Sequence, residues 1–298
     1  MSLALPGPWV EQVAGYPADG GPTGADWVRE VPRLVAAGLE RWGLRVDGAP
    51  RTGWTALVVP VRRHDEPYAL KVAWPHPEGR LEHLALRHWD GAGAVRLVAA
   101  HPADGLLLLE RLDADEDLGG VWTDEACAVI GGLLARLGVP APPQVETLAA
   151  YLPPHLERMG RRPAVPRRVV ERTRGLAREL LGDPGPGLLL HTDLHYENVL
   201  RAPDGRWLAI DPKPLAGHPG FELLPAVRNR TSELGTPGAS LRWSVRHRLS
   251  VLAEAAGIDE DEARAWSLLR AGLETSWATL EGEDAVTLGV ALTKALDD

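Results

Sequence analysis

The sequence predicts an α+β protein with two parts, a small antiparallel sheet followed by a mainly helical region. Three observations lead to this class. Short apolar runs of strand length crowd the first third of the chain, a single helical pattern lies among them, and mostly helical patterns follow residue 112. Strands in succession followed by helices in succession are typical of α+β proteins, whereas βαβ units would alternate the two.

The chain is expected to begin with an irregular arm and a helix. Glycine and proline are frequent in residues 1–25, and this composition favours a segment without regular structure. Apolar residues then recur at helical spacing until Gly43, where a glycine can end the helix. The residues with this spacing are Trp27, Val31, Leu34, Val35, Leu39 and Trp42.

Apolar runs predict five strands in the rest of the first part. The runs at 54–61 and 67–74 flank the polar stretch RRHDE, and we expect them to form an antiparallel hairpin. The other three runs lie at 44–46, 95–100 and 105–112. Between the runs at 67–74 and 95–100, residues 77–90 have the spacing of a helix, with Leu81, Leu84, Ala85 and Trp89 on one face.

The second part follows the polar, glycine-rich stretch DADEDLGG at 113–120, which we interpret as a connector. Helices are predicted near 123–137, 144–159, 166–182, 221–229, 240–256, 259–280 and 283–296. Three short strands interrupt them at 188–191, 198–201 and 207–211. We therefore divide the chain into residues 1–111 and residues 112–298.

Composition limits the possible functions. With 298 residues and 45% hydrophobic content, the chain can form two domains of ordinary size or one large domain, with a real core. A net charge of −9 argues against binding to nucleic acid or to an anionic membrane, and it is compatible with a small cationic ligand. The single cysteine, the absence of a signal-peptide pattern and the lack of a long apolar stretch lead us to expect a cytoplasmic protein.

The stretch LLLHTDLHYENVL at 188–200 carries the first catalytic motif. His191, Asp193 and Asn198 have the spacing H-x-D-x-x-x-x-N of a kinase catalytic loop, and Asp211 ends an apolar strand further on. An aspartate can orient an attacking hydroxyl, while asparagine and aspartate oxygens are hard ligands suited to Mg²⁺. A solvated turn between strands is the alternative for Asp193 and Asn198, but Asp211 needs a partner at its strand end.

Lys71 is the second catalytic candidate. The chain contains 29 arginines and only three lysines, and Lys71 lies inside the strand pattern YALKVAW. The simplest interpretation is a surface lysine, but a lysine in this strand of a small sheet can also hold the phosphates of a nucleotide. The expected partner is Glu82 on the following helix, with Glu78 as a less favoured alternative in the first turn.

Four stretches together resemble the aminoglycoside/hydroxyurea resistance kinase family, which includes streptomycin 6-phosphotransferases. They are LLLHTDLHYENVL, LAIDPKPLAGHPGFELLPAVRNR, LALRHWDGAGAVRLV and LLLLERL. The resemblance implies a two-lobed protein-kinase-like fold and phosphorylation of a small-molecule hydroxyl by ATP with Mg²⁺. It implies residues 1–111 as the nucleotide-binding lobe and residues 112–298 as the lobe with the catalytic loop and the acceptor pocket.

By position, the resemblance assigns roles to individual residues. Asp193 becomes the catalytic base, Asn198 and Asp211 the Mg²⁺ ligands, and Lys71 with Glu82 the phosphate anchor. Backbone groups near Glu110 and Leu112 are expected to bond adenine. The expected substrate residues are Glu197, Glu222, Asn229, Glu274 and Trp277. For Trp277 a packing role is favoured, and Glu222 and Asn229 also suit a helix cap and a solvated face.

The chain departs from the family at two loop positions and leaves the acceptor open. Thr192 stands where many relatives have glycine, and Glu197 where many have a small residue. We expect a monomer that phosphorylates a small cationic molecule, with an aminoglycoside such as streptomycin as the leading candidate. The alternatives are a kinase of a sugar or other ordinary metabolite and a nucleotide-binding protein without activity.

Overall fold

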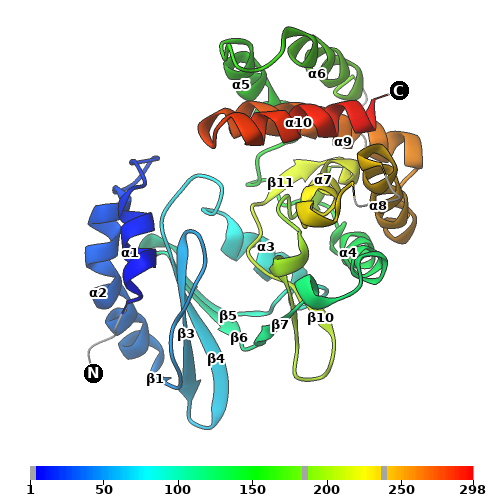
Figure 1. The fold of residues 1–298 in the computed structure, drawn as a ribbon. Helices are drawn as coiled ribbons and strands as arrows, with labels where there is room; N and C mark the ends of the chain where they lie inside the picture. Colours follow the sequence, from blue (N-terminus) through cyan, green and yellow to red (C-terminus); the bar gives the residue numbers. More distant parts are fainter. Residues whose placement is uncertain (1–4, 183–186, 236–239, 298) are drawn as a thin grey trace. The chain divides into compact units, whose positions relative to one another are not determined.

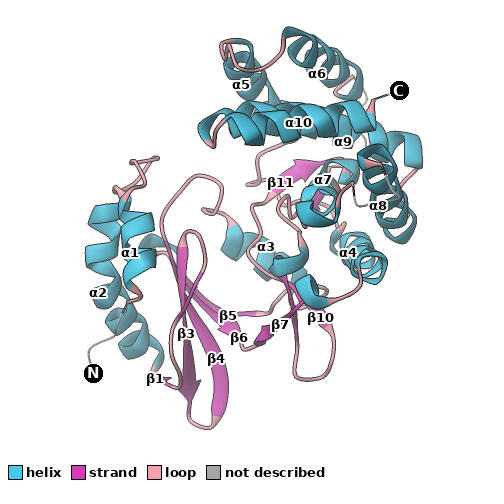
Figure 2. Ribbon diagram, viewed as in Figure 1, coloured by secondary structure: helices cyan, strands magenta, loops and turns pink. Residues whose placement is uncertain are grey.

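The computed structural model describes residues 5–182, 187–235 and 240–297, and the predicted α+β class is confirmed (Figures 1 and 2). The chain separates into two compact units. The first comprises residues 1–114 and 201–213, and the second comprises residues 115–200 and 214–298. The division at residues 111 and 112 stays a prediction, and the two units differ from it mainly in residues 201–213.

The first unit contains an antiparallel six-stranded sheet. Its order is β1-β3-β4-β6-β5, and β2 pairs with β3 at the edge of this path. The strands are β1 (Arg45–Val46), β2 (Arg51–Thr52), β3 (Ala56–Arg63), β4 (Glu66–Ala73), β5 (Leu97–His101) and β6 (Leu106–Glu110). Each of the five predicted strands overlaps one of these, and β2 is additional. In the β3–β4 hairpin, Val58 faces Lys71 and Val59 faces Leu70.

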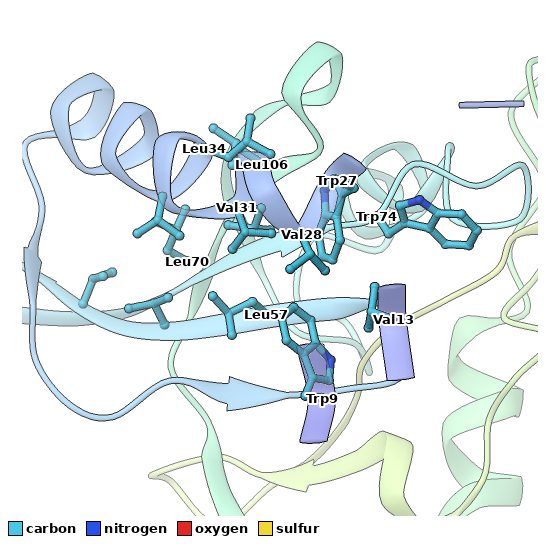
Figure 3. Packing of buried hydrophobic residues seen from close by; sticks show 14 of the residues in the cluster. Trp9, Val13, Trp27, Val28, Val31, Leu34, Leu57, Leu70, Trp74 and Leu106 are labelled. Atoms are coloured by element: carbon cyan, nitrogen blue, oxygen red, sulfur yellow. The ribbon is translucent and has the colours of Figure 1, made fainter. Parts of the chain in front are cut away.

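Residues 1–25 were predicted to be irregular, and this prediction was wrong at residues 7–14, which form a helix. Helix α1 (Gly7–Ala14) precedes helix α2 (Gly24–Trp42), while residues 1–4 lie outside the described residues. Two apolar side chains four residues apart explain α1, because Trp9 and Val13 both enter the core (Figure 3). The Trp9 ring packs edge-on against Trp27 at 5.8 Å, and its Nε1 donates to Gly53 O at 2.8 Å.

The core of the first unit joins these two helices to the sheet. Trp27, Leu57 and Leu70 are members of one buried cluster that also contains the inward side chains of β3, β4 and β6 (Figure 3). Strand β4 is buried on both faces near its end, because Leu70, Lys71 and Val72 are all at most 5% exposed. A lysine in this strand is therefore not a surface residue. Between β4 and β5 lies helix α3 (Glu82–Trp89), which is shorter than the predicted helix at 77–90.

The predicted connector at 113–120 also needs correction, because β7 (Asp113–Asp117) forms there. It belongs to a three-stranded sheet of order β10-β9-β7, with β9 (Val199–Arg201) and β10 (Trp207–Ala209). Four of the five residues of β7 are exposed, and no apolar alternation marks this strand in the sequence. Its backbone pairing is what makes it a strand.

The second unit is mainly helical, as predicted (Figure 2). Its helices are α4 (Thr123–Leu137), α5 (Leu148–Gly160), α6 (Arg167–Leu180), α7 (Leu224–Arg228), α8 (Leu241–Ala256), α9 (Glu260–Trp277) and α10 (Glu283–Leu296). Small residues allow close helix packing: a Cβ at Gly272 on α9 would lie 1.9 Å from Thr173 Oγ1 on α6. None of the helices in the described part of the chain is long and apolar enough to cross a membrane.

A two-stranded ladder in the second unit leads into the motif at 191–198. Strand β8 (Leu188–Leu190) pairs antiparallel with β11 (Leu215–Gly217), and the loop begins directly after β8. Leu194 and Tyr196 are fully buried, and the Tyr196 hydroxyl lies 3.2 Å from Cys127 Sγ on α4. These buried side chains fix the loop between them, and a 3₁₀ turn at Tyr196–Asn198 closes it.

Candidate active site

Lys71 is the centre of a charged group in the first unit. Its Nζ donates to both carboxylate oxygens of Glu82, at 2.7 and 2.8 Å, and also to Asp211 Oδ1. Glu82 is the first residue of α3, and its side chain is only 5% exposed. Glu78, the alternative partner, is exposed. The expected Lys71–Glu82 contact is therefore present, with Asp211 as a further carboxylate on the same ammonium.

The electrostatics keep Lys71 charged despite its burial. Burial by itself lowers the pKa of an ammonium, because the charged form loses its hydration. The carboxylates of Asp211 and Glu82 outweigh this effect and raise the pKa of Lys71 above its ordinary value. This lysine is therefore charged at any physiological pH.

Asp211 follows β10 and has an unusual backbone conformation. Its φ of +59° lies in the left-handed region, which aspartate tolerates better than most residues. The preceding strand end is anchored within the first unit, since Ala209 N donates to Gly93 O and Val95 N donates to Ala209 O. The side chain keeps 41% exposure, so it remains accessible beside the buried Lys71.

The loop of the second unit holds Asp193 and Asn198 through local contacts. His191 is buried, and its Nδ1 accepts a hydrogen bond from Asp193 N at 3.3 Å, in line with a structural role for this histidine. Asn198 Nδ2 donates to Asp193 O at 2.8 Å and also lies 3.1 Å from His195 Nε2. These contacts orient the amide nitrogen of Asn198 into the loop, which leaves the amide oxygen as the candidate metal ligand.

Two of the predicted substrate residues contact each other on the surface of this unit. Asn229 Nδ2 donates to Glu197 Oε2 at 3.1 Å, and His195 Nδ1 lies 2.7 Å from the same oxygen. The Glu197 side chain is 52% exposed. An accessible carboxylate beside the loop suits a cationic ligand, so Glu197 and Asn229 stay substrate candidates.

The other predicted substrate residues have partners inside the protein. Glu222 is only 3% exposed, and its Oε1 accepts from Thr192 N at 3.2 Å. Burial raises the pKa of the Glu222 carboxyl to about 7, against the weaker effects of the Thr192 amide and Arg270. Glu274 pairs with Arg270 at 3.0 Å and with Arg228 at 2.8 Å.

Trp277 and Glu110 also have internal contacts. Trp277 Nε1 donates to His155 Nδ1 at 3.3 Å, and the two rings pack edge-on, which agrees with the packing role favoured from the sequence. Glu110 N donates to Arg96 O at 3.0 Å, while Glu110 Oε1 accepts from Arg96 N. The amide of Glu110 is thus used within the first unit, and its contact with adenine stays a prediction. For Leu112 the prediction stands as made.

Sequence reasoning missed Arg270, although a signal for it exists. This arginine is 6% exposed and lies in the apolar run WSLLRAGL of α9. Its Nη1 donates to Phe221 O at 3.0 Å and its Nη2 donates to Thr192 O, so it reaches the motif loop from a distant helix. A lone arginine within an apolar helical run predicts a buried charge that needs partners.

Comparison with known proteins identifies the class to which this fold and these residues belong. A choline/ethanolamine kinase family protein from Mesorhizobium loti has a similar structure, with a TM-score of 0.62 at 16% identity, covering 88% of this chain and 93% of that one. The expected protein-kinase-like fold is thereby confirmed. The class is that of small-molecule kinases, because sequence relatives that are 34–43% identical over most of the chain are named as kinases or phosphotransferases of small molecules.

The family within this class is shown by sequence. The profile of the aminoglycoside/hydroxyurea antibiotic resistance kinase family matches residues 41–282, and the chain belongs to this family. A hydroxyurea phosphotransferase from Kitasatospora aureofaciens is 43% identical, covering 95% of this chain and 83% of that protein. A streptomycin 6-kinase from Streptomyces griseus is 39% identical, covering 94% of each.

Proposed function

We propose that this protein transfers the γ-phosphoryl group of ATP to a hydroxyl of a small cationic molecule, with streptomycin as the leading candidate. The observation that carries the proposal is the buried Lys71, which holds Glu82 and Asp211 on one ammonium. A surface lysine or a solvated turn would not need this arrangement. In the reaction, Lys71 pairs with phosphate oxygens, and Glu82 keeps the ammonium in position.

Asp193 is the proposed base for the acceptor hydroxyl. Its carboxylate orients the hydroxyl and accepts the proton as the new oxygen–phosphorus bond forms. The bond between the γ-phosphorus and its bridging oxygen breaks at the same time, and ADP leaves with the electron pair. Hydrogen bonds from Asp193 N to His191 and from Asn198 to Asp193 O fix the backbone that carries this carboxylate.

The donor set fits Mg²⁺. Asn198 and Asp211 would hold the ion through amide and carboxylate oxygens, the ligands that hard divalent cations prefer. The amide nitrogen of Asn198 is already used within the loop, which supports the amide oxygen as the proposed ligand. When bound, the ion would supply positive charge that neutralises the negative charge developing during transfer.

The acceptor class follows from charge. The chain carries a net charge of −9, and Glu197 offers an exposed carboxylate supported by Asn229 and His195. Carboxylates pair well with ammonium and guanidinium groups, which favours an aminoglycoside over a neutral sugar. Hydroxyurea is a second candidate, because the relative from Kitasatospora aureofaciens is named for it and is 43% identical.

A panel assay tests the proposal. Purified protein is incubated with ATP and streptomycin, hydroxyurea, a second aminoglycoside or glucose, and both ADP release and phosphorylated product are measured. We expect product with streptomycin, and an Asp193→Asn variant should be slower by roughly 10²–10⁴-fold with nearly unchanged ATP affinity. Product only with glucose would favour the metabolite kinase. Binding of ATP without product from any acceptor would favour the inactive nucleotide-binding protein.

A further inference from the structure

The residue before Asp193 is held in a conformation that it would not adopt by itself. Thr192 has a φ of +58°, in the left-handed region that favours glycine. For an L-residue this region is disfavoured by about five- to thirty-fold, and a β-branched side chain adds to the penalty. Because the Thr192 carbonyl belongs to the peptide that joins it to Asp193, rotation of this peptide would also turn Asp193. Some part of the structure must therefore hold Thr192 in this conformation.

Two buried charged side chains bind this residue from opposite sides. Glu222 Oε1 accepts from Thr192 N at 3.2 Å, and Arg270 Nη2 donates to Thr192 O. Glu222 is 3% exposed and Arg270 is 6% exposed, so water does not compete for these bonds. Both the donor and the acceptor of the strained residue are thus satisfied by side chains that come from other elements.

The two side chains are also linked to each other. Arg270 Nη1 donates to the carbonyl of Phe221 at 3.0 Å, the residue directly before Glu222. Arg270 Nε donates to Glu274 at 3.0 Å, and Arg228 lies 2.8 Å from the other oxygen of Glu274. The guanidinium is therefore fixed on three sides. Thr192, Glu222, Phe221 and Arg270 form a closed ring of hydrogen bonds and covalent links.

We propose that Glu222 and Arg270 are positioning residues that hold Thr192 in its left-handed conformation and thereby aim Asp193 at the acceptor hydroxyl. This inference rests on the proposed role of Asp193. It replaces the substrate role predicted for Glu222, because both its burial and its bond to the loop direct it away from a ligand. Without the ring, Thr192 relaxes toward ordinary φ values, and Asp193 is correctly placed in only a fraction of molecules.

The experiment is a double-mutant cycle between Glu222 and Thr192. Steady-state kinetics with ATP and streptomycin are measured for wild type, Glu222→Ala, Thr192→Gly and the double variant. Glu222→Ala should lower kcat by about tenfold, within the range set by the conformational penalty, with the KM for ATP unchanged. In the Thr192→Gly background the same change should lower kcat by no more than about twofold, because glycine tolerates the left-handed conformation.

Conservative and matched variants separate positioning from simple loss of stability. Glu222→Gln keeps an oxygen acceptor for Thr192 N and should retain most of the kcat. Thr275→Val removes a buried hydrogen bond to Ala271 O on the same helix as Arg270, away from the loop, and should leave kcat unchanged. If Glu222→Ala does not fold, Arg270→Lys is measured with Thr192 and with Thr192→Gly. It should lower kcat in the first background and change it by no more than about twofold in the second.

Three outcomes would overturn the inference. An equal fall in kcat in both backgrounds would show that Glu222 does not act through Thr192. A raised KM for streptomycin with unchanged kcat would return Glu222 to the acceptor. If wild type phosphorylates no acceptor, the proposed function fails, and the cycle is then measured by urea unfolding, which needs no substrate. Additive changes of the urea midpoint would reject the ring in that case, and non-additive changes would support it.

Discussion

Burial of Glu222 makes the stability of this protein depend on pH in a way that one substitution should remove. The carboxyl is 3% exposed, and its pKa rises from an ordinary value of 4.5 to about 7 because burial disfavours the charged form. Glutamine has nearly the same shape as a protonated glutamate and carries no charge. We therefore expect Glu222→Gln to stabilise the protein at alkaline pH and to change little at acidic pH.

The sign follows from proton linkage. A carboxyl with a higher pKa in the folded state binds its proton more tightly there than in the unfolded chain. The contribution of this proton to the free energy of unfolding is fully present below pH 4.5, and it is lost as pH rises through about 7. The rise in pKa corresponds to about 3 kcal/mol at most, because one pKa unit is worth about 1.4 kcal/mol.

Urea unfolding at a series of pH values measures this contribution. The free energy of unfolding is determined for wild type and Glu222→Gln between about pH 5 and about pH 8.5, the window in which Glu222 changes its charge. The difference between the two curves cancels the other titrating groups. It should grow in favour of the variant by up to about 3 kcal/mol across this window.

An exposed carboxylate provides the control. Glu171 is 64% exposed and pairs only with Arg167 on the same helix surface, so Glu171→Gln should shift the curve by less than about 1 kcal/mol at every pH. Parallel curves for wild type and Glu222→Gln would refute the reasoning. Such a result would mean that the folded protein supplies Glu222 with enough compensation to keep it ionised at neutral pH.

Three further predictions concern the charged group, the metal and the helix packing. Lys71→Ala should abolish efficient use of ATP, and it should lower the free energy of unfolding by about 3–5 kcal/mol because it leaves Glu82 buried without its cation. Lys294→Ala, at an exposed site, is the control. Wild-type ATP kinetics in Lys71→Ala would contradict the prediction. Excess EDTA should stop phosphate transfer, and Mg²⁺ or Mn²⁺ should restore it, whereas full activity in EDTA would exclude the proposed ligands. Gly272→Ala places a Cβ 1.9 Å from Thr173 Oγ1 and should cost about 1–3 kcal/mol in urea unfolding, while Gly175→Ala, with no atom within 4 Å, should not destabilise.

The sequence predicts the sheet and the contact between Lys71 and Glu82 well because their signals are local, whereas the contact with Asp211 joins residues 140 positions apart. Alternating and continuous apolar runs fix β3 and β4, and the hairpin between them follows from their short separation. The helix that carries Glu82 begins nine residues after the end of β4, so the partner of Lys71 could be chosen from a short segment. The sequence does not show that the Lys71–Glu82 pair is buried. It therefore does not predict how much free energy of unfolding is lost when the pair is broken.

Elements stabilised by backbone pairing or by a few distant contacts are harder to predict. Strand β7 is acidic and exposed, and no apolar pattern distinguishes it from a connector. Helix α1 has only eight residues, and it depends on Trp9 and Val13 reaching the core formed by α2 and the sheet. A helix of this length is not stable by itself in water, so its existence depends on contacts that the local sequence does not contain.

The carboxylates predicted to bind the substrate show the same limit at the level of single residues. Glu197 lies within the motif and Glu222 follows it, and composition gives no reason to treat them differently. Their environments differ because α9 brings Arg270, 48 residues beyond Glu222, to the peptide before Asp193. A carboxylate on the surface can recruit a cationic acceptor, whereas a buried one can only bond to the protein. The resemblance to the family predicts which residues take part in the chemistry, whereas long-range packing decides which of the other carboxylates are exposed and which are buried.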